Sequence, residues 1–229
     1  MANVLVTLNC NRKCSFCFAR ERTKNAPDEN AYTRNMSMDN VRKVMDFQEK
    51  SNDRNLKLLG GEPTMHPEFI RIVEEAVARK FHVHLFSNCI MSSEKADFLG
   101  ALPPGQLSVL ANVSPQANDT ERQITMRSYA LEKLGRCAAL GITVTAPEFA
   151  FDFLIDYIEQ FGLAPTVRVG IAQPIVGTDN DYLDPEDYPK VGAGIVKMAE
   201  TCVEKDILIG FDCGLTLCMF TEEQLGRLA

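Results

Sequence analysis

The sequence lacks any apolar run approaching the ~18 residues of a membrane-spanning helix, so we expect no membrane span. Residues 1–6 contain neither a basic region nor a small-residue cleavage site, so no secretory signal is expected. Basic side chains are in deficit, with 24 Lys and Arg against 31 Asp and Glu and a net charge of −7, which argues against a nucleic-acid surface. These absences predict a soluble, cytoplasmic protein.

No linker rich in Gly, Ser or Pro divides the 229 residues. A single α/β barrel commonly fills about 200–250 residues, so one main domain is the simplest interpretation. The apolar fraction of 45% and the charged fraction of 24% are ordinary for a globular protein and exclude wholesale disorder.

Short apolar runs alternate along the chain with longer segments of helical period. The expected strands cover residues 3–9, 56–59, 82–86, 107–113, 142–146, 166–172 and 207–211. The expected helices cover residues 38–49, a segment from 67 with an apolar stripe of Phe69, Ile70, Val73 and Val77, then 93–101, 121–140, 151–162 and 187–205. This alternation predicts an α/β fold of parallel strands, either an incomplete barrel or an open doubly wound sheet. In both, ligands bind at the carboxyl ends of the strands.

Eight cysteines in a chain without an export signal are unusual. Because cytosolic thiols stay reduced, metal binding or catalysis is a better interpretation than disulfide bonds. Three cysteines stand singly among apolar neighbours and are expected to be buried small hydrophobes: Cys89, Cys137 and Cys202. The others form a tight cluster after the first strand, Cys10, Cys14 and Cys17, and a looser pair, Cys213 and Cys218.

Three thiolates on one short loop can converge on a metal centre. Structural zinc needs four closed ligands, and no nearby fourth cysteine or histidine completes the set, although His66, His82 and His84 could join it, so zinc is the weaker alternative. A [4Fe–4S] cluster normally takes four cysteines, so three would leave one iron open to another ligand. An open position is chemically useful, as it is in a catalytic zinc site.

The pattern Cys10-x3-Cys14-x2-Cys17, with Phe16 before the last cysteine, resembles the signature of radical S-adenosylmethionine (radical SAM) enzymes. The resemblance implies a partial (β/α)6 barrel with helices outside, a [4Fe–4S] cluster on the three cysteines, and S-adenosylmethionine (SAM) at the open iron, near Phe16. It implies reductive cleavage of SAM to methionine and a 5′-deoxyadenosyl radical that abstracts hydrogen from a substrate. The sequence does not identify that substrate. The implied electron donor is a flavodoxin- or ferredoxin-type protein.

The second expected strand ends in Gly60-Gly61-Glu62-Pro63. On its own this segment is typical of a tight turn in which glycine supplies positive φ. In the family that it resembles, the same motif closes the second strand and receives the methionine amino group of the cofactor. Backbone carbonyls and a carboxylate suit an ammonium group, so all four residues are candidate cofactor contacts.

Weaker correspondences lie at later strand ends. Ser87 and Asn88 stand where the family often has Thr-Asn-Gly, with Cys89 in place of the glycine. Asn112 and Ser114 resemble an Asn-x-Ser whose hydroxyl contacts the cofactor carboxylate or ribose. Ordinary capping at the strand end explains these residues equally well.

Two arginines and two histidines are weaker candidates for cofactor binding, ligation or catalysis. Arg122 or Arg127 could pair with the cofactor carboxylate, although a solvated helix face is the favoured interpretation of both. His82 and His84 alternate along one strand and therefore share a face, where hydrogen-bonded packing is favoured over ligation or catalysis.

Cys213 and Cys218 resemble the start of the cysteine-rich (SPASM/twitch-like) extensions that carry auxiliary [4Fe–4S] clusters in many members of the family. This interpretation divides the chain into a barrel domain, residues 1–206, and the start of a C-terminal extension, residues 207–229. Two thiolates cannot complete a cluster, so further ligands would have to join them. Two buried thiols near a chain end are the competing interpretation.

Two rival functions remain open at this stage. A non-enzymatic metal-binding or redox-sensing module would use the three clustered cysteines but would leave Gly60-Gly61-Glu62-Pro63 unexplained. An ordinary α/β-barrel aldolase or isomerase with incidental cysteines would need a lysine or paired carboxylates at strand ends, and none stands in a compelling position.

Overall fold

The computed structural model describes residues 3–19, 34–115, 119–177, 179–212 and 214–228. Its sheet has seven parallel strands in sequence order: β1 Asn3–Thr7, β2 Asn55–Gly60, β3 His82–Ser87, β4 Leu107–Asn112, β5 Ala138–Val144, β6 Thr166–Ile171 and β7 Leu208–Phe211. The helices are α3 Met38–Lys50, α4 Phe69–Ala78, α5 Ser93–Gly100, α6 Glu121–Leu134, α7 Asp152–Phe161, α8 Tyr188–Glu204 and α9 Glu222–Leu228. The fold is α/β, as predicted.

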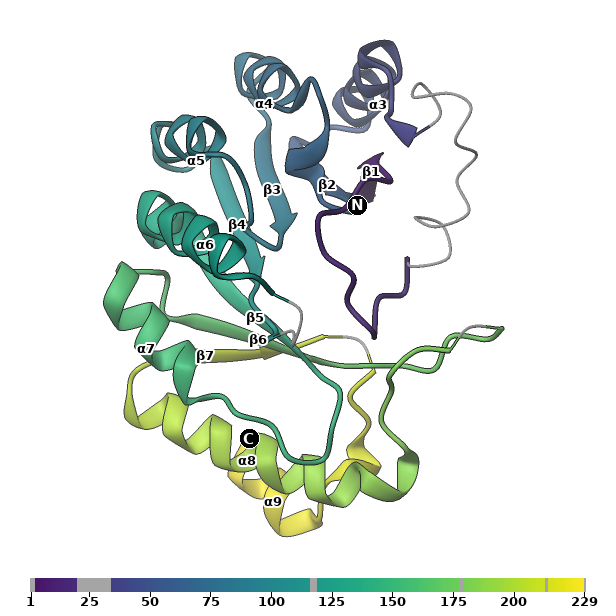
Figure 1. Ribbon diagram of the computed structural model, residues 1–229, viewed down its shortest axis with the longest axis vertical. Coiled ribbons are helices and arrows are strands. Elements are labelled where there is room, and N and C mark those ends of the chain that lie inside the picture. Colours follow the sequence, from purple (N-terminus) through teal and green to yellow (C-terminus); the bar gives the residue numbers. More distant parts are fainter. Residues whose placement is uncertain (1–2, 20–33, 116–118, 178, 213, 229) are drawn as a thin grey trace.

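The sheet is curved but not closed, because β1 and β7 are its two edges. Figure 1 shows α3 to α6 along the outer side of the curved sheet, with α8 and α9 at the end that carries β6 and β7. The molecule is therefore a partial barrel with helices outside. None of the helices in the described ranges has the length and apolar character that crossing a bilayer requires.

Alternating burial along β3 shows why the sheet has two different faces. Val83 and Leu85 are buried in the core shared with the helices, while His82, His84 and Phe86 between them are half-buried. This two-residue period puts Val83 and Leu85 under the helices and the half-buried side chains on the concave face. The concave face is consequently less buried than the face under the helices.

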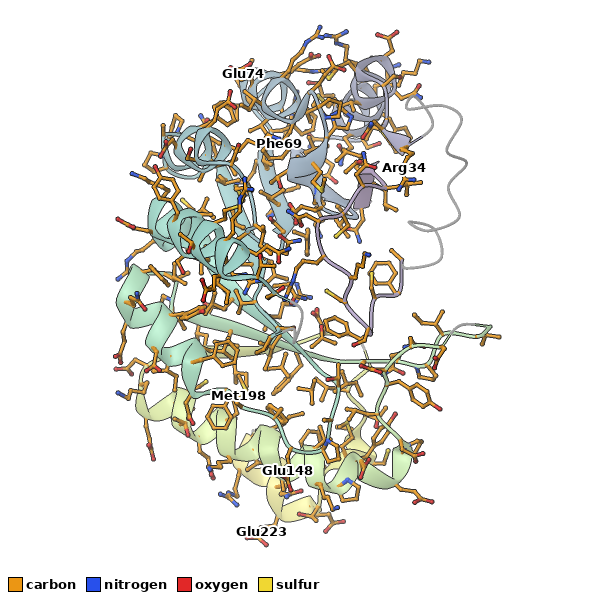
Figure 2. The ribbon with its side chains drawn as sticks, in the orientation of Figure 1. Arg34, Phe69, Glu74, Glu148, Met198 and Glu223 are labelled. Carbon is orange, nitrogen blue, oxygen red and sulfur yellow. The ribbon has the colours of Figure 1, made fainter. Side chains whose placement is uncertain are left out.

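The core lies between the sheet and the outer helices. Phe69 of α4 and Met198 of α8, labelled in Figure 2, are fully buried, whereas Glu74 and Glu223 are exposed. The apolar face of α4 consists of Phe69, Ile72, Val73 and Ala76. Of the predicted stripe, Phe69 and Val73 are buried on this face, while Ile70 and Val77 flank it, half-buried and packed against the core.

Two neighbouring predicted boundaries were wrong. The helix expected over residues 121–140 ends at Leu134, and the strand expected over 142–146 begins at Ala138. Gly135, with a φ of 46°, ends the helix in a conformation that favours glycine. Ala138 then pairs with Val109 of β4, so tertiary pairing overrides the helical preference of the Ala-Ala-Leu run.

A candidate cluster and cofactor site

The loop after β1 carries Cys10, Cys14 and Cys17, which are half-buried free thiols. In Figure 1 this segment runs from β1 across the open side of the barrel. It turns between Cys14 and Cys17, where the Cys17 N–H donates to the Cys14 carbonyl oxygen at 3.2 Å. The backbone N–H of Arg12 donates to the Cys10 Sγ at 3.5 Å. Phe16 lies half-buried in the same turn.

Burial affects the protonation of two thiols in this loop. Burial raises the pKa of Cys10 to about 11, although the hydrogen bond from the Arg12 N–H opposes the rise. Burial also raises the pKa of Cys14, with the positive charge of Arg12 opposing it. These thiols are therefore protonated at neutral pH, and binding iron as thiolates would release protons.

In the described part of the chain, no three His, Cys, Asp or Glu side chains gather closely enough to hold a single metal ion. A [4Fe–4S] cluster needs no such convergence, because each iron takes its own cysteine. Each of the three thiols of this loop could therefore ligate one iron of such a cluster.

The side chain of Arg12 ties the cysteine loop to the end of β4 and to the start of α6. Its Nε and Nη2 donate to the two carboxylate oxygens of Asp119 at 3.0 and 2.6 Å, and Nη2 also donates to the Ser114 carbonyl oxygen at 2.8 Å. The same carboxylate accepts from Arg127 Nη2 at 2.8 Å. Burial alone would raise the pKa of Asp119, but the hydrogen bonds from Arg127 and Arg12 outweigh it and lower the pKa.

The interpretation of Arg127 as a solvated residue was wrong, since only 5% of it is exposed. Its guanidinium reaches the Asp119 carboxylate and the Asn88 carbonyl oxygen at the end of β3. Arg122 is exposed on α6, as the solvated interpretation predicted. Arg122 and Arg127 are five residues apart, which is about 140° around an α-helix, so they lie on different sides of α6 and Arg127 is on the inward one.

Asn11 provides a second anchor for the cysteine loop. Its Nδ2 donates to the Ile90 carbonyl oxygen at 2.6 Å, and its Oδ1 accepts from Asn88 Nδ2 at 2.8 Å. Gln123 Nε2 on α6 donates to the Asn11 carbonyl oxygen at 3.0 Å. The sequence analysis missed Asn11, Arg12 and Asp119. The only signal was the position of the first two between the clustered cysteines, where a polar side chain has to find partners.

Gly60 and Gly61 do not have positive φ values, so the interpretation of a turn that needs positive φ was wrong. Their lack of a side chain instead lets two backbone segments lie close together. A Cβ on Gly60 would stand 2.5 Å from the Thr7 carbonyl oxygen, and one on Gly61 would stand 2.4 Å from the Asn9 carbonyl oxygen. The Gly61 N–H donates to Thr7 at 2.8 Å and the Glu62 N–H to Asn9 at 2.7 Å. The glycines therefore let the end of β2 touch the start of the cysteine loop.

Glu62 is 1% exposed and is held by four hydrogen bonds. Its Oε1 accepts from the Thr64 N–H at 3.2 Å, the Thr64 Oγ1 at 2.8 Å and the Ser87 Oγ at 2.8 Å, while Oε2 accepts only from the Asn88 N–H at 2.8 Å. Pro63 begins the 3₁₀ turn that Glu62 caps. Burial raises the pKa of Glu62 against the effect of these bonds. No cationic side chain among the described residues forms an ion pair with it.

At the end of β3, one residue that is not glycine adopts a backbone conformation typical of glycine. Cys89 has a φ of 59°, in the left-handed region that favours glycine, and its N–H donates to the Ser87 Oγ at 2.9 Å. Asn88 uses its Oδ1 to accept from the Ile90 N–H at 2.8 Å. Ser87 and Asn88 therefore lie at the predicted place, where they hold the Glu62 carboxylate.

Asn112 and Ser114 are brought together at the end of β4. The Ser114 Oγ donates to Asn112 Oδ1 at 2.8 Å and accepts from the Thr143 N–H at 2.8 Å. Ser114 is buried, while Asn112 is half-buried. The serine hydroxyl is thus engaged in capping, and the Asn112 Nδ2 is the group of this pair that donates to no described residue.

Three further cysteines and two histidines were interpreted as packing groups. Cys89 and Cys202 are buried as predicted, and Cys137 is partly buried. His82 and His84 share a face, with ring centroids 4.4 Å apart. Both are hydrogen-bonded: His82 contacts Ser108 Oγ at 2.7 Å, and His84 contacts Asn55 Oδ1 at 3.0 Å.

Cys213 lies outside the described residues. Cys218 is exposed, with its Sγ 3.0 Å from the Thr216 Oγ1. The competing interpretation of a buried thiol is therefore wrong for Cys218.

Comparisons with known proteins agree with this arrangement. The family model described as Radical SAM superfamily matches residues 4–147. Streptococcus suis SuiB bound to S-adenosylmethionine superposes with a TM-score of 0.68 at 15% identity over 90% of this chain and 48% of that one. The structure of native anSMEcpe with bound AdoMet gives a TM-score of 0.65 at 16% identity, over 90% of this chain and 62% of that one. The chain thus spans less than two thirds of either, and at these identities the likeness shows the fold alone. No curated protein sequence matches the chain.

Proposed function

Because this chain belongs to the radical SAM superfamily, we propose that it binds a [4Fe–4S] cluster through Cys10, Cys14 and Cys17 and cleaves SAM reductively. The observation that carries the proposal is the junction of the two motifs. The Glu62 N–H donates to the Asn9 carbonyl oxygen at 2.7 Å, which places the Gly60–Pro63 turn directly beside the cysteine loop.

When bound and reduced, the cluster supplies the electron that cleaves SAM into methionine and a 5′-deoxyadenosyl radical. The chain contributes position and charge. Its three thiolates ligate three irons and leave the fourth open. The half-buried loop and the strand ends beside it limit the access of water and of stray hydrogen donors.

Glu62 is the candidate receptor for the SAM ammonium group. Its carboxylate is buried, and no cationic side chain of the described residues pairs with it. Oε2 accepts one hydrogen bond and has capacity for another. An ammonium donor at Oε2 would supply the missing counter-charge. The Asn112 Nδ2 is the corresponding candidate for the cofactor carboxylate or ribose.

The electron donor of our proposal is a flavodoxin- or ferredoxin-type protein. Phe18, next to the last clustered cysteine, is 72% exposed and gives such a donor an apolar contact close to the cluster. The substrate remains unassigned.

We also propose that Cys218 ligates an auxiliary [4Fe–4S] cluster together with Cys213. The exposure of the Cys218 thiol supports this role, because an accessible thiol can join ligands from elsewhere. The proposed boundary at residue 206 falls just before β7, which pairs with β6 in the same sheet.

The test of the main proposal is anaerobic reconstitution followed by iron, sulfide and visible absorption analysis and a SAM cleavage assay under dithionite. We expect about four irons per chain on the first site and formation of 5′-deoxyadenosine. Replacing Cys10, Cys14 or Cys17 with Ala should abolish both, whereas Cys137→Ala, which removes a thiol elsewhere, should abolish neither. Production of 5′-deoxyadenosine by the triple variant would contradict the proposal.

A further inference from the structure

Arg12 is the charged residue between the first two clustered cysteines whose side chain is buried in the protein. Only 2% of that side chain is exposed, while the neighbouring Lys13 is exposed. Its guanidinium makes three hydrogen bonds, two to the Asp119 carboxylate and one to the Ser114 carbonyl oxygen. A planar guanidinium bound at both carboxylate oxygens is fixed in direction as well as in distance.

Asp119 is shared by two guanidinium groups. Arg127 of α6 donates to the same Oδ2 at 2.8 Å, and the carboxylate side chain is 8% exposed. Arg127 in turn reaches the Asn88 carbonyl oxygen beyond β3. This buried Arg12–Asp119–Arg127 triad therefore connects the cysteine loop with the segments that follow β3 and β4. A surface ion pair would not fix a loop in this way, because exposed charges are solvated and screened.

The backbone of Arg12 is directed at the metal site while its side chain is directed away from it. The Arg12 N–H donates to the Cys10 Sγ, a predicted iron ligand. Hydrogen bonds to cluster sulfur atoms tune reduction potential, and residues that hold the ligands matter nearly as much as the ligands. The anchored side chain and the N–H···S bond belong to the same residue, so loss of the anchor also frees the N–H.

We propose that Arg12 is a positioning residue for the cluster: its side chain, clamped by Asp119, holds the loop between Cys10 and Cys14 so that its N–H stays on the Cys10 sulfur. The inference rests on the proposed function of the three cysteines. In this proposal the triad helps to set the reduction potential of the cluster, because an N–H···S bond stabilises the reduced form, which carries more negative charge.

The experiment compares Arg12→Met with Lys13→Met in the reconstituted protein. Each variant removes one positive charge from the same loop, but only the first removes the anchor. The midpoint potential and the electron paramagnetic resonance spectrum of the reduced cluster are measured, with thermal unfolding of the cluster-free protein as a check on folding. We expect Arg12→Met to shift the potential to more negative values and to change the spectrum, while Lys13→Met leaves the spectrum that of the unmodified protein. Arg12→Lys, which can keep one contact to Asp119, should fall between them.

Equal shifts of the midpoint potential in the two Met variants would overturn the inference, because the loss of charge alone would then explain them. An unchanged midpoint potential in Arg12→Met would overturn it as well. A folded Arg12→Met protein that cannot hold the cluster supports the inference if Lys13→Met holds it. If Arg12→Met does not fold, Arg12→Lys is judged by the same criteria. An unmodified protein that assembles no cluster would instead refute the proposed function, which keeps the two failures apart.

Discussion

The backbone N–H of Glu62 donates to the carbonyl oxygen of Asn9 across 2.7 Å. One residue earlier, Gly61 approaches the same carbonyl so closely that a Cβ would lie 2.4 Å from it. The turn after β2 and the cysteine loop are thus in backbone contact, and this contact depends on glycine.

Gly61→Ala should therefore displace the cysteine loop. Relieving the overlap with the backbone of Asn9 would cost on the order of 1–3 kcal/mol of stability and should lower the amount of cluster bound. Denaturant unfolding and iron analysis measure the two effects. Gly226→Ala is the matched control, because a Cβ there meets nothing within 4 Å on helix α9. Normal iron content in Gly61→Ala would show that the contact is not needed.

Glu62→Gln should weaken SAM binding while the cluster spectrum stays intact. Loss of a charge-assisted hydrogen bond to the cofactor ammonium is worth about 1.5–3 kcal/mol, so affinity should fall roughly ten- to a hundred-fold. Calorimetry on the reconstituted protein measures the dissociation constant. Thr64→Val provides the comparison, since it removes one hydrogen bond to Glu62 and leaves the charge. Equal losses in both variants would assign Glu62 to the turn alone.

Local spacing made part of this site predictable from the sequence. Three cysteines within eight residues and the Gly60–Pro63 segment are short patterns whose meaning does not depend on distant residues. Arg12 and Asp119 are 107 residues apart in the sequence, and no local pattern predicts their contact. The role of Gly61 was equally hidden, because the close approach involves the backbone of Asn9, which is distant in the sequence. The same limit explains the early start of β5, which pairing with β4 decides.

Cys89 should reverse the usual order of stability between Ala and Gly. At its φ of 59° a Cβ is strained, so Cys89→Gly should be more stable than Cys89→Ala by about 1 kcal/mol. In a right-handed helix, alanine is instead more stabilising than glycine. Gly194→Ala in helix α8 cannot serve as the comparison, because the added Cβ would overlap the Phe149 ring. Chemical denaturation of the two Cys89 variants measures the difference. A more stable Ala variant would show that the turn relaxes.

The Arg12–Asp119–Arg127 triad should leave a signature in the acid stability of the protein. Asp119→Asn removes the shared carboxylate and leaves two buried guanidinium groups without their counter-charge, at a cost of about 3–5 kcal/mol near neutral pH. Because the folded-state pKa of Asp119 is lowered, its contribution is complete above the ordinary carboxyl pKa of about 4 and is lost as the pH falls through the lower folded value.

The difference in unfolding free energy between the unmodified protein and Asp119→Asn should therefore be constant near neutral pH and shrink below about pH 4. Urea unfolding across this range measures it. Asp97→Asn is the matched control, because Asp97 pairs with Lys133 while about half exposed, and exposed pairs contribute about 0–1 kcal/mol. A difference that stays the same in acid would mean that Asp119 stabilises the fold through shape and not through its charge on Arg12 and Arg127.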